Sequence, residues 1–275
     1  MVRRSLTLAM LLALAGAGSG RAQILVAPIQ LFLRERAPLG TFYLYNQSQQ
    51  SQEIAISFRF GYPVASDSGG AGMLYGDTLP LKERSMQGWV RAFPRQFVLG
   101  PGQRQEVRIT ARPPQDLPEG MYWTRLVTTS TPQVPSVDSV APGVSARIIF
   151  KLEQITTVLF ARGQTATALS ADTPRVRLDS VQLSFFAHIA PGGNAPFFGT
   201  STLRIRNAGG VQLDSSIVKF AMYTPIVQRF DFARKSLPPG TYRAELRVTS
   251  ERDDIAAQDL LRTEPVVREV PFTIP

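Results

Sequence analysis

The turns Leu117-Pro-Glu-Gly-Met-Tyr122 and Leu237-Pro-Pro-Gly-Thr-Tyr242 share one spacing of leucine, proline, glycine and tyrosine, and each leads into alternating apolar and polar residues. A tyrosine that enters a strand directly after such a turn is typical of a tyrosine corner, whose ring packs inward while its hydroxyl bonds the nearby backbone. The pattern can also recur by chance in a chain rich in proline and glycine. Two copies nevertheless predict two similar β-sandwiches in one chain.

Alternation with a period of two dominates the rest of the sequence, and helical periodicity is hard to find. The segments predicted as strands are 40–46, 54–62, 105–110, 122–129 and 144–152, followed by 175–188, 200–207, 211–223, 227–232, 241–249 and 266–274. Strands of this length without helices between them favour antiparallel sandwiches over a parallel sheet. The predicted fold class is therefore all-β, with two immunoglobulin-like β-sandwich domains in tandem.

The N-terminal residues have the pattern of a secretory signal peptide. Arg3 and Arg4 give a positive start, an apolar run follows over 6–15, and Gly20-Arg-Ala22 fits a cleavage site. A membrane-spanning helix needs about twice that length of apolar residues, and no later segment supplies it. We predict a signal peptide over 1–22, an N-terminal domain over 23–162 and a C-terminal domain over 163–275. Residues 62–88 are predicted as a long connection with at most one short strand.

The composition excludes several kinds of chemistry. The 275 residues include no cysteine, which rules out zinc ribbons, iron–sulfur clusters, thiol nucleophiles and disulfides. His188 is the only histidine and lies in a predicted strand, where a structural role is expected, and Asp253-Asp254 is interpreted as a solvated acidic pair. The 30 basic and 21 acidic residues are spread along the chain, without the patch that nucleic-acid binding needs. We predict no catalytic residue, no metal site, no cofactor and no nucleic-acid partner.

The segment Val144-Ser-Ala-Arg-Ile-Ile-Phe-Lys-Leu-Glu153 has one apolar face. The residues between its apolar positions are polar except Ile149, and the apolar positions are Val144, Ala146, Ile148, Phe150 and Leu152. On the pattern alone, such a face is expected to pack into the core of its own sandwich. Residues 130–143 before it are predicted as a loop.

Residues 24–162 resemble the periplasmic pilus-assembly chaperones of the PapD-like family. The stretches that carry the resemblance, in order, are Ile24-Leu-Val-Ala-Pro-Ile-Gln-Leu31, Leu44-Tyr-Asn46-Gln-Ser48, Phe97-Val-Leu-Gly-Pro-Gly-Gln-Arg-Gln-Glu-Val-Arg108-Ile109, Leu117-Pro-Glu-Gly-Met-Tyr122-Trp123, and the alternating strand that runs into Val158-Leu-Phe160. Residues 165–275 fit a second immunoglobulin-like domain but carry no diagnostic motif.

The resemblance implies an exported, ATP-independent chaperone of the periplasm that captures incomplete pilus or fimbrial subunits in the cleft between its domains. In that family the last strand of the first domain lends apolar side chains to a subunit that lacks a strand, which is β-augmentation. Carried onto this chain, the donor residues are Ile148, Phe150 and Leu152, with Val144 and Ala146 as weaker extensions. Pilin-like subunits are the expected partners, an outer-membrane usher is a further candidate, and no enzyme activity is expected.

The chain departs from the family where the terminal carboxylate of the subunit is held. The family uses an arginine on the first strand and a lysine near the end of the donor strand, which make charge-assisted contacts. The first position falls here on Gln30, and the second falls on Thr157 or Val158 according to a one-residue choice of alignment. None of these residues is basic. Three arginines are candidates to replace them, and the sequence does not select among Arg34, Arg36 and Arg162.

Two other functions stay open at this point. A structural or adhesive immunoglobulin-like module of the cell envelope would use the strand 144–152 as ordinary core. An exported hydrolase of unrecognised type would need a catalytic base, and His188 is the only histidine.

Overall fold

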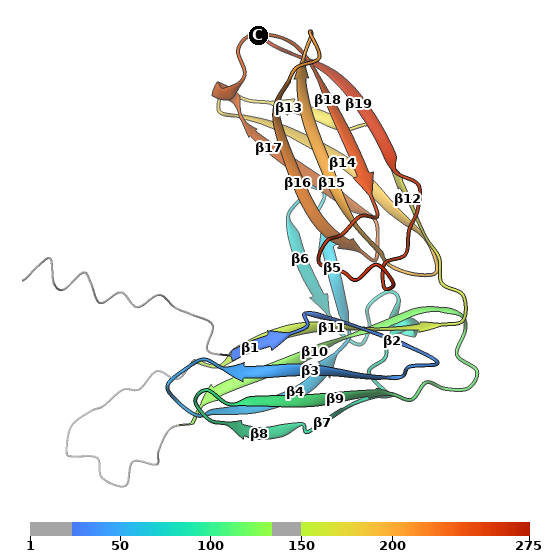
Figure 1. Ribbon diagram of the computed structural model, residues 1–275. Coiled ribbons are helices and arrows are strands. Elements are labelled where there is room, and N and C mark those ends of the chain that lie inside the picture. Colours follow the sequence, from blue (N-terminus) through green and yellow to red (C-terminus); the bar gives the residue numbers. More distant parts are fainter. Residues whose placement is uncertain (1–23, 134–149) are drawn as a thin grey trace, which may run out of the picture.

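The structure, a computed structural model, describes residues 24–133 and 150–275. The predicted signal peptide and the donor positions Val144, Ala146 and Ile148 lie outside the described residues. The described chain consists of β-strands, their connections and two short 3₁₀ helices, η2 (Lys82–Arg84) and η3 (Arg234–Ser236). It forms two β-sandwiches, so the prediction of an all-β chain with two sandwich domains is confirmed (Figure 1). No helix in these two ranges is long and apolar enough to cross a membrane.

The first sandwich packs a four-stranded sheet, ordered β1–β3–β9–β7, on a five-stranded sheet, ordered β2–β11–β10–β4–β8. The four-stranded sheet comprises β1 (Ile24–Ala27), β3 (Leu39–Asn46), β9 (Arg104–Ala111) and β7 (Val90–Phe93). The five-stranded sheet comprises β2 (Gln30–Arg34), β11 (Leu152–Arg162), β10 (Gly120–Pro132), β4 (Gln52–Arg59) and β8 (Gln96–Leu99). Neighbours are antiparallel except β2 and β11, which run parallel. The core between the sheets includes Phe42, Leu126 and Phe160.

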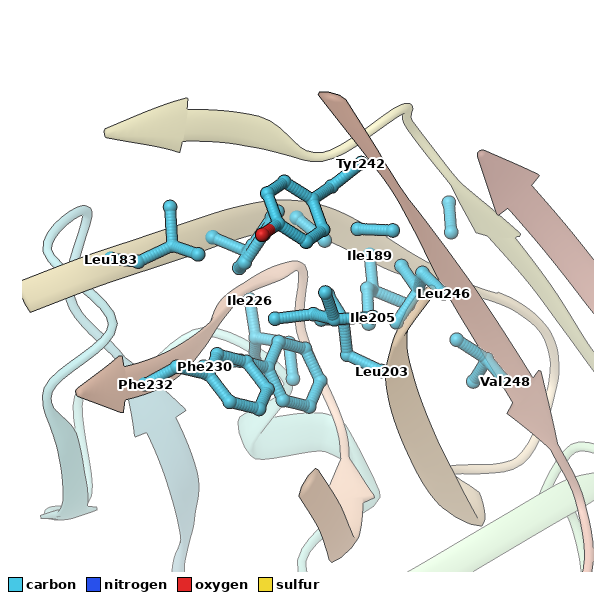
Figure 2. Packing of buried hydrophobic residues seen from close by; sticks show 14 of the residues in the cluster. Leu183, Ile189, Leu203, Ile205, Ile226, Phe230, Phe232, Tyr242, Leu246 and Val248 are labelled. Atoms are coloured by element: carbon cyan, nitrogen blue, oxygen red, sulfur yellow. The ribbon is translucent and has the colours of Figure 1, made fainter. Parts of the chain in front are cut away.

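The second sandwich also has two sheets. In the first, β12 (Thr167–Ala171), β13 (Arg175–Leu178) and β17 (Ile226–Ala233) all pair with β14 (Gln182–Gly193). The second is ordered β16–β15–β18–β19 and comprises β16 (Gln212–Met222), β15 (Phe197–Asn207), β18 (Gly240–Thr249) and β19 (Val266–Ile274). Fully buried side chains such as Leu183, Leu203 and Leu246 come from strands of both sheets and meet between them (Figure 2).

The single strand predicted over 175–188 is wrong, because a turn divides it into β13 and β14. The Asp179 carboxylate accepts hydrogen bonds from the backbone N–H groups of Val181 and Gln182, at 2.8 and 2.7 Å. These bonds stabilise the turn and hold the pKa of Asp179 below its usual value.

Both predicted tyrosine corners are present. The Tyr122 hydroxyl donates to the Pro118 carbonyl oxygen at 2.7 Å, and the Tyr242 hydroxyl donates to that of Pro238 at 2.5 Å. Both rings are buried, and Tyr242 stacks on Phe272 of the last strand. Each hydrogen bond therefore fixes the turn to the strand that follows it.

We expect Tyr242→Phe to lower the free energy of unfolding by about 1 kcal/mol, because the ring still packs but the hydrogen bond to Pro238 is lost. Urea unfolding followed by circular dichroism measures the change. Tyr45→Phe is the matched control, since Tyr45 lies partly exposed on β3, and it should change stability much less. An equal loss in both variants would mean that the Tyr242 hydroxyl does not hold its turn.

A hairpin outside both sandwiches corrects the prediction of a long connection over 62–88. Strands β5 (Gly61–Ala65) and β6 (Ala71–Tyr75) pair into a two-stranded sheet of their own. Alternation is weak there because every residue of β6 is exposed. The hairpin leaves the first domain and reaches β16 and β17 of the second, where Ala65 packs on the core (Figure 1).

A third buried cluster joins the two domains, and we call it the interdomain cluster. Its members are Phe60, Tyr62, Met121, Trp123 and Leu159 from the first domain, with Ala195, Phe198, Tyr223, Ile255 and Leu260 from the second. The ring centroids of Trp123 and Tyr223 are 4.7 Å apart, and Tyr62 stacks on Tyr223 at 6.0 Å. The cluster holds the outer face of the five-stranded sheet against the second domain.

Candidate functional site

The N-terminal part of β11 is an edge with a strand partner on one side only. β10 pairs with β11 along its whole length, from Leu152 to Arg162. β2 pairs with the other side only from Thr157 to Ala161. Within the part of the chain that the structure describes, residues 152–156 therefore have no strand on that side. We call residues 152–156 the open edge.

The backbone of the open edge is oriented for pairing. The Thr157 N–H donates to the Ile29 carbonyl oxygen at 3.0 Å, just before β2 begins. Because the peptide groups of successive residues point to opposite sides of a strand, the N–H and C=O groups of Glu153 and Ile155 point the same way as that N–H. They lie beyond the end of β2, and unpaired groups of this kind are a template for another strand.

The apolar face of β11 is buried at one end and bare at the other. Val158 and Phe160 are fully buried in the core of the first sandwich. Leu152 on the same face is 40% exposed, and Phe150 is 76% exposed. Both described donor positions thus lie outside the core of their own domain. Within the described residues the strand predicted over 144–152 begins only at Leu152, so Phe150 precedes the strand.

The positions predicted to replace a pair of basic anchors come together. The register of β2 and β11 places Gln30 directly opposite Thr157. Val158, the alternative position, is fully buried in the core of the first sandwich. Of the two candidates on β11, Thr157 is therefore the one that lies on the outer face of the sheet, toward the second domain.

The three arginines considered as replacements lie outside this row. Arg34 pairs with Asp259 of the second domain at 2.8 Å, and Arg162 pairs with Glu35 at 2.9 Å. Arg36 is exposed in the turn after β2. Two of the three are thus already held by carboxylates, and none stands opposite Gln30 or Thr157.

The basic group of the site is Arg125, which the sequence patterns did not reveal. The pairing registers place it in one row across β4, β10, β11 and β2 that consists of Arg59, Arg125, Thr157 and Gln30. Arg125 is 5% exposed. Its Nε donates to the Gly61 carbonyl oxygen at 3.0 Å, its Nη1 donates to Thr157 Oγ1, and its Nη2 is buried without a partner. The guanidinium thus keeps one unused donor group.

One signal in the sequence could have drawn attention to Arg125. It stands between Trp123 and Val127 on one face of β10, and both of these neighbours are buried. A charged residue on an otherwise apolar face is rarely buried unless it has a partner. The partner strands could not be known from the sequence, so the row that Arg125 shares with Thr157 stayed hidden.

The charge of Arg125 has no counterion among the described residues. Its neighbour Arg59, by contrast, contacts the Glu153 carboxylate twice, at 3.0 and 3.1 Å. Arginine does not lose its proton in a protein, so burial leaves the charge in place. The Tyr223 ring offsets part of the cost, because Arg125 Cζ lies 5.1 Å from its centroid and a desolvated cation–π contact contributes about 2 kcal/mol.

Other polar atoms in this part of the molecule are also unsatisfied. Gln30 Oε1, Trp123 Nε1 and the Tyr223 hydroxyl are buried without a hydrogen bond. Each such group costs about 1–3 kcal/mol. Burial raises the pKa of Tyr223, while the charge of Arg125 acts in the opposite direction. Two of these three groups are donors, Trp123 Nε1 and the Tyr223 hydroxyl, and unused donors beside a buried positive charge favour an anionic group that accepts hydrogen bonds.

The lone histidine stands apart from this site. His188 lies on the exposed face of the second sandwich, with Nδ1 3.7 Å from the Asp172 carboxylate. In residues 24–133 and 150–275, no three His, Cys, Asp or Glu side chains gather closely enough to hold a metal ion. The row around Arg125 offers hydrogen-bond donors and a positive charge, which suit the binding of an anionic group.

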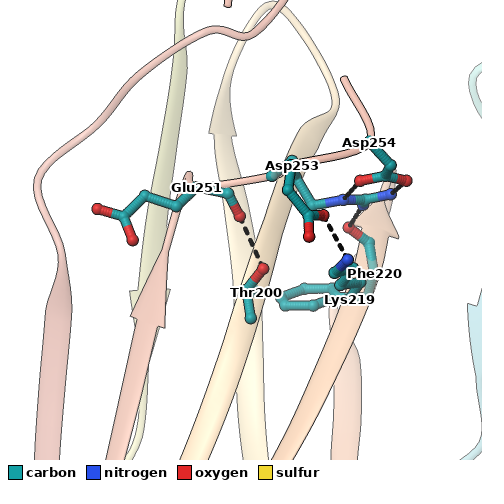
Figure 3. Close-up of polar contacts among 7 residues, drawn as sticks. Thr200, Lys219, Phe220, Glu251, Asp253 and Asp254 are labelled. Atoms are coloured by element: carbon teal, nitrogen blue, oxygen red, sulfur yellow. Dashed lines mark hydrogen bonds and ion pairs between the residues drawn. The ribbon is translucent and has the colours of Figure 1, made fainter. Parts of the chain in front are cut away.

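The acidic pair predicted as solvated is indeed exposed, and it also fastens the loop after β18. Asp253 accepts a hydrogen bond from Lys219, and Asp254 pairs with Arg252 at 2.6 Å (Figure 3). These partners hold the pKa of both carboxyl groups below the usual value. The same loop supplies Ile255 to the interdomain cluster, so its attachment helps to position the second domain.

No protein-family model matches this chain, and no curated protein matches it. Among solved structures, the YadV chaperone is 10% identical, with a TM-score of 0.44 over 91% of this chain and 100% of that chain. A structure of the Salmonella enterica SafA pilin with the SafB chaperone is 11% identical, with a TM-score of 0.43 over 92% of this chain and 99% of that chain. The CsuC–CsuE chaperone–tip adhesion subunit complex of Acinetobacter baumannii is 11% identical, with a TM-score of 0.41 over 76% of this chain and 90% of that chain. The function is therefore inferred from the geometry of the site itself.

Proposed function

We propose that this chain is an exported, ATP-independent chaperone that binds incomplete β-sandwich subunits of pilus type by lending them a strand. The observation that carries the proposal is the open edge, where Leu152 and the backbone of Glu153 and Ile155 have no partner strand in the described chain. A subunit that lacks a strand has a matching defect, namely an open groove and unpaired backbone groups. Pairing the two edges removes both defects together.

The alternation of β11 supports a defined register for the added strand. In strand addition the backbone ladder supplies affinity, while alternate side chains that enter pockets fix the register. Leu152 has the same parity as Phe150, Ile148, Ala146 and Val144. These five side chains would share one face if the client extends the strand toward residue 144, and they are the donor residues that we propose.

Arg125 supplies the anchor in this proposal. It would hold the terminal carboxylate of the client in place of the basic pair that Gln30 and Thr157 lack. A carboxylate offers two acceptor oxygens, which suit the unused Nη2 of Arg125 beside Thr157. Leu152 lies five residues along β11 from Thr157, or about 16 Å. A client whose terminus is held at Arg125 would therefore have its register fixed over the whole open edge.

The proposal is tested by amide hydrogen exchange on the free protein and on its complex with a purified pilin-type subunit that lacks a strand. We expect the Glu153 and Ile155 amides to exchange quickly in the free protein and to become protected in the complex. The Thr157 amide is the internal control, since its hydrogen bond to Ile29 should protect it in both states. A complex that leaves Glu153 and Ile155 unprotected would contradict strand addition, and protection in the free protein would favour a structural module.

A further inference from the structure

The binding group of the first domain is covered by a residue of the second. Tyr223 directly follows β16, is 6% exposed and has its ring over the Arg125 guanidinium. The same ring contacts Trp123, with the centroids 4.7 Å apart, and stacks on Tyr62. Any group that reaches Arg125 from the side of the second domain must therefore share the space around Tyr223.

The covered arrangement leaves donors unused on both sides of the domain boundary. Arg125 Nη2 and the Tyr223 hydroxyl are both buried, and neither makes a hydrogen bond of normal geometry. Apolar packing in the interdomain cluster holds them together, while the unpaired polar atoms oppose the contact. A carboxylate with two acceptor oxygens would give both donors a partner.

The structure also provides room for Tyr223 to move. A cavity of about 190 Å³ adjoins the ring and is lined by Leu81, Arg84, Trp123, Asn194 and Pro196 among others. It lies between the first domain and the β14–β15 connection of the second. A shift of the ring into this space would uncover Arg125.

We propose that Tyr223 is a cover over Arg125 that moves when a carboxylate binds, so that capture of a client by the first domain changes the contact between the two domains. The inference rests on the proposed function in assigning the carboxylate to a client. Tyr223 is then a positioning residue, because it controls access to Arg125 and lends its hydroxyl once the anion has entered. Its place on the second domain makes the domain contact part of the binding equilibrium.

The test uses Trp123 as a natural reporter. The chain has two tryptophans, so Trp89→Phe leaves Trp123, which contacts Tyr223, as the only tryptophan, and excitation at the long-wavelength edge of tryptophan absorption selects it over the tyrosines. The probes are two dye-labelled peptides of sequence Val-Thr-Val-Thr-Val-Thr-Phe, one with a free carboxylate and one with a terminal amide. Fluorescence polarisation of the dye reports binding, and Trp123 emission reports the cover.

We expect the free acid to bind about ten to one hundred times more tightly than the amide and to shift Trp123 emission, while the amide leaves the emission unchanged. Tyr223→Phe should reduce the preference for the acid several-fold and should not lower the thermal stability of the free protein. If the acid is preferred but Trp123 emission stays constant, the cover is disproved while strand binding stands. If neither peptide binds, the proposed function fails and the cover fails with it.

Discussion

Replacing Leu152 by Asp is expected to abolish the complex with a pilin-type subunit while the free protein folds normally. In the free protein this side chain is 40% exposed, so a carboxylate there stays in water and costs little. In the complex it would enter an apolar groove, where an unpaired charge is strongly unfavourable. We expect affinity to fall by about 100-fold or more, which corresponds to about 3 kcal/mol. Size-exclusion chromatography and titration calorimetry measure the loss, and Phe150→Asp should behave in the same way.

Two variants separate this effect from damage to the fold. Lys151→Asp introduces the same charge at the neighbouring, exposed position of opposite parity, and it should leave the complex largely intact. Val158→Asp places the charge on the same face as Leu152 but inside the core, and it should unfold the first sandwich. If Leu152→Asp lowers the unfolding temperature as Val158→Asp does, the strand belongs to the core and the structural or adhesive alternative is preferred.

Replacing Arg125 by Met is expected to weaken client binding by about 10- to 100-fold without lowering the stability of the free protein. The reason is that the guanidinium is buried with an unused donor and without a counterion in the described chain. Exchanging such a charge for an apolar side chain of similar length removes an electrostatic cost while keeping the packing on Tyr223. Calorimetry on the complex measures the client affinity, and urea unfolding measures the stability of the free protein.

Arg59→Met is the matched control for Arg125→Met, because Arg59 stands next to Arg125 in the same row but is exposed and paired with Glu153. An exposed ion pair contributes about 0–1 kcal/mol, so both stability and binding should change little. A loss of several kcal/mol in the free Arg125→Met protein would instead identify the guanidinium as a structural tie between Gly61 and Thr157. Full client affinity in that variant would rule out Arg125 as the anchor.

The sequence predicts the fold where one local pattern is sufficient. Alternation and two copies of a turn that enters a strand at Tyr122 and Tyr242 predict two sandwiches, because both signals depend only on neighbouring residues. The β5–β6 hairpin escaped prediction since β6 is exposed on both faces and therefore has no apolar alternation. The split of the strand over 175–188 depends on the turn at Asp179, whose carboxylate accepts two backbone hydrogen bonds. This turn leaves the alternation on either side intact, so the pattern did not reveal it.

The site was predictable only in part for a similar reason. The apolar face that includes Leu152 is visible in a single segment. The row of Arg59, Arg125, Thr157 and Gln30 depends on the registers of three strand pairs, which join residues far apart in the sequence. The choice between Thr157 and Val158 likewise needed the register, because a shift of one residue exchanges the two faces of a strand.

The β5–β6 hairpin constrains how the sequences of the two sandwiches can change in evolution. Because Tyr62 on this hairpin packs against Tyr223, a recombination event that replaced either half of the gene near Gly163 would combine aromatic surfaces that had not evolved together. Such chimaeras would keep both tyrosine corners and still lack a matched partner for Tyr62. Substitutions on the two sides of this contact are thus expected to be inherited as a set, and we expect the chain to diverge as one piece rather than by exchange of domains.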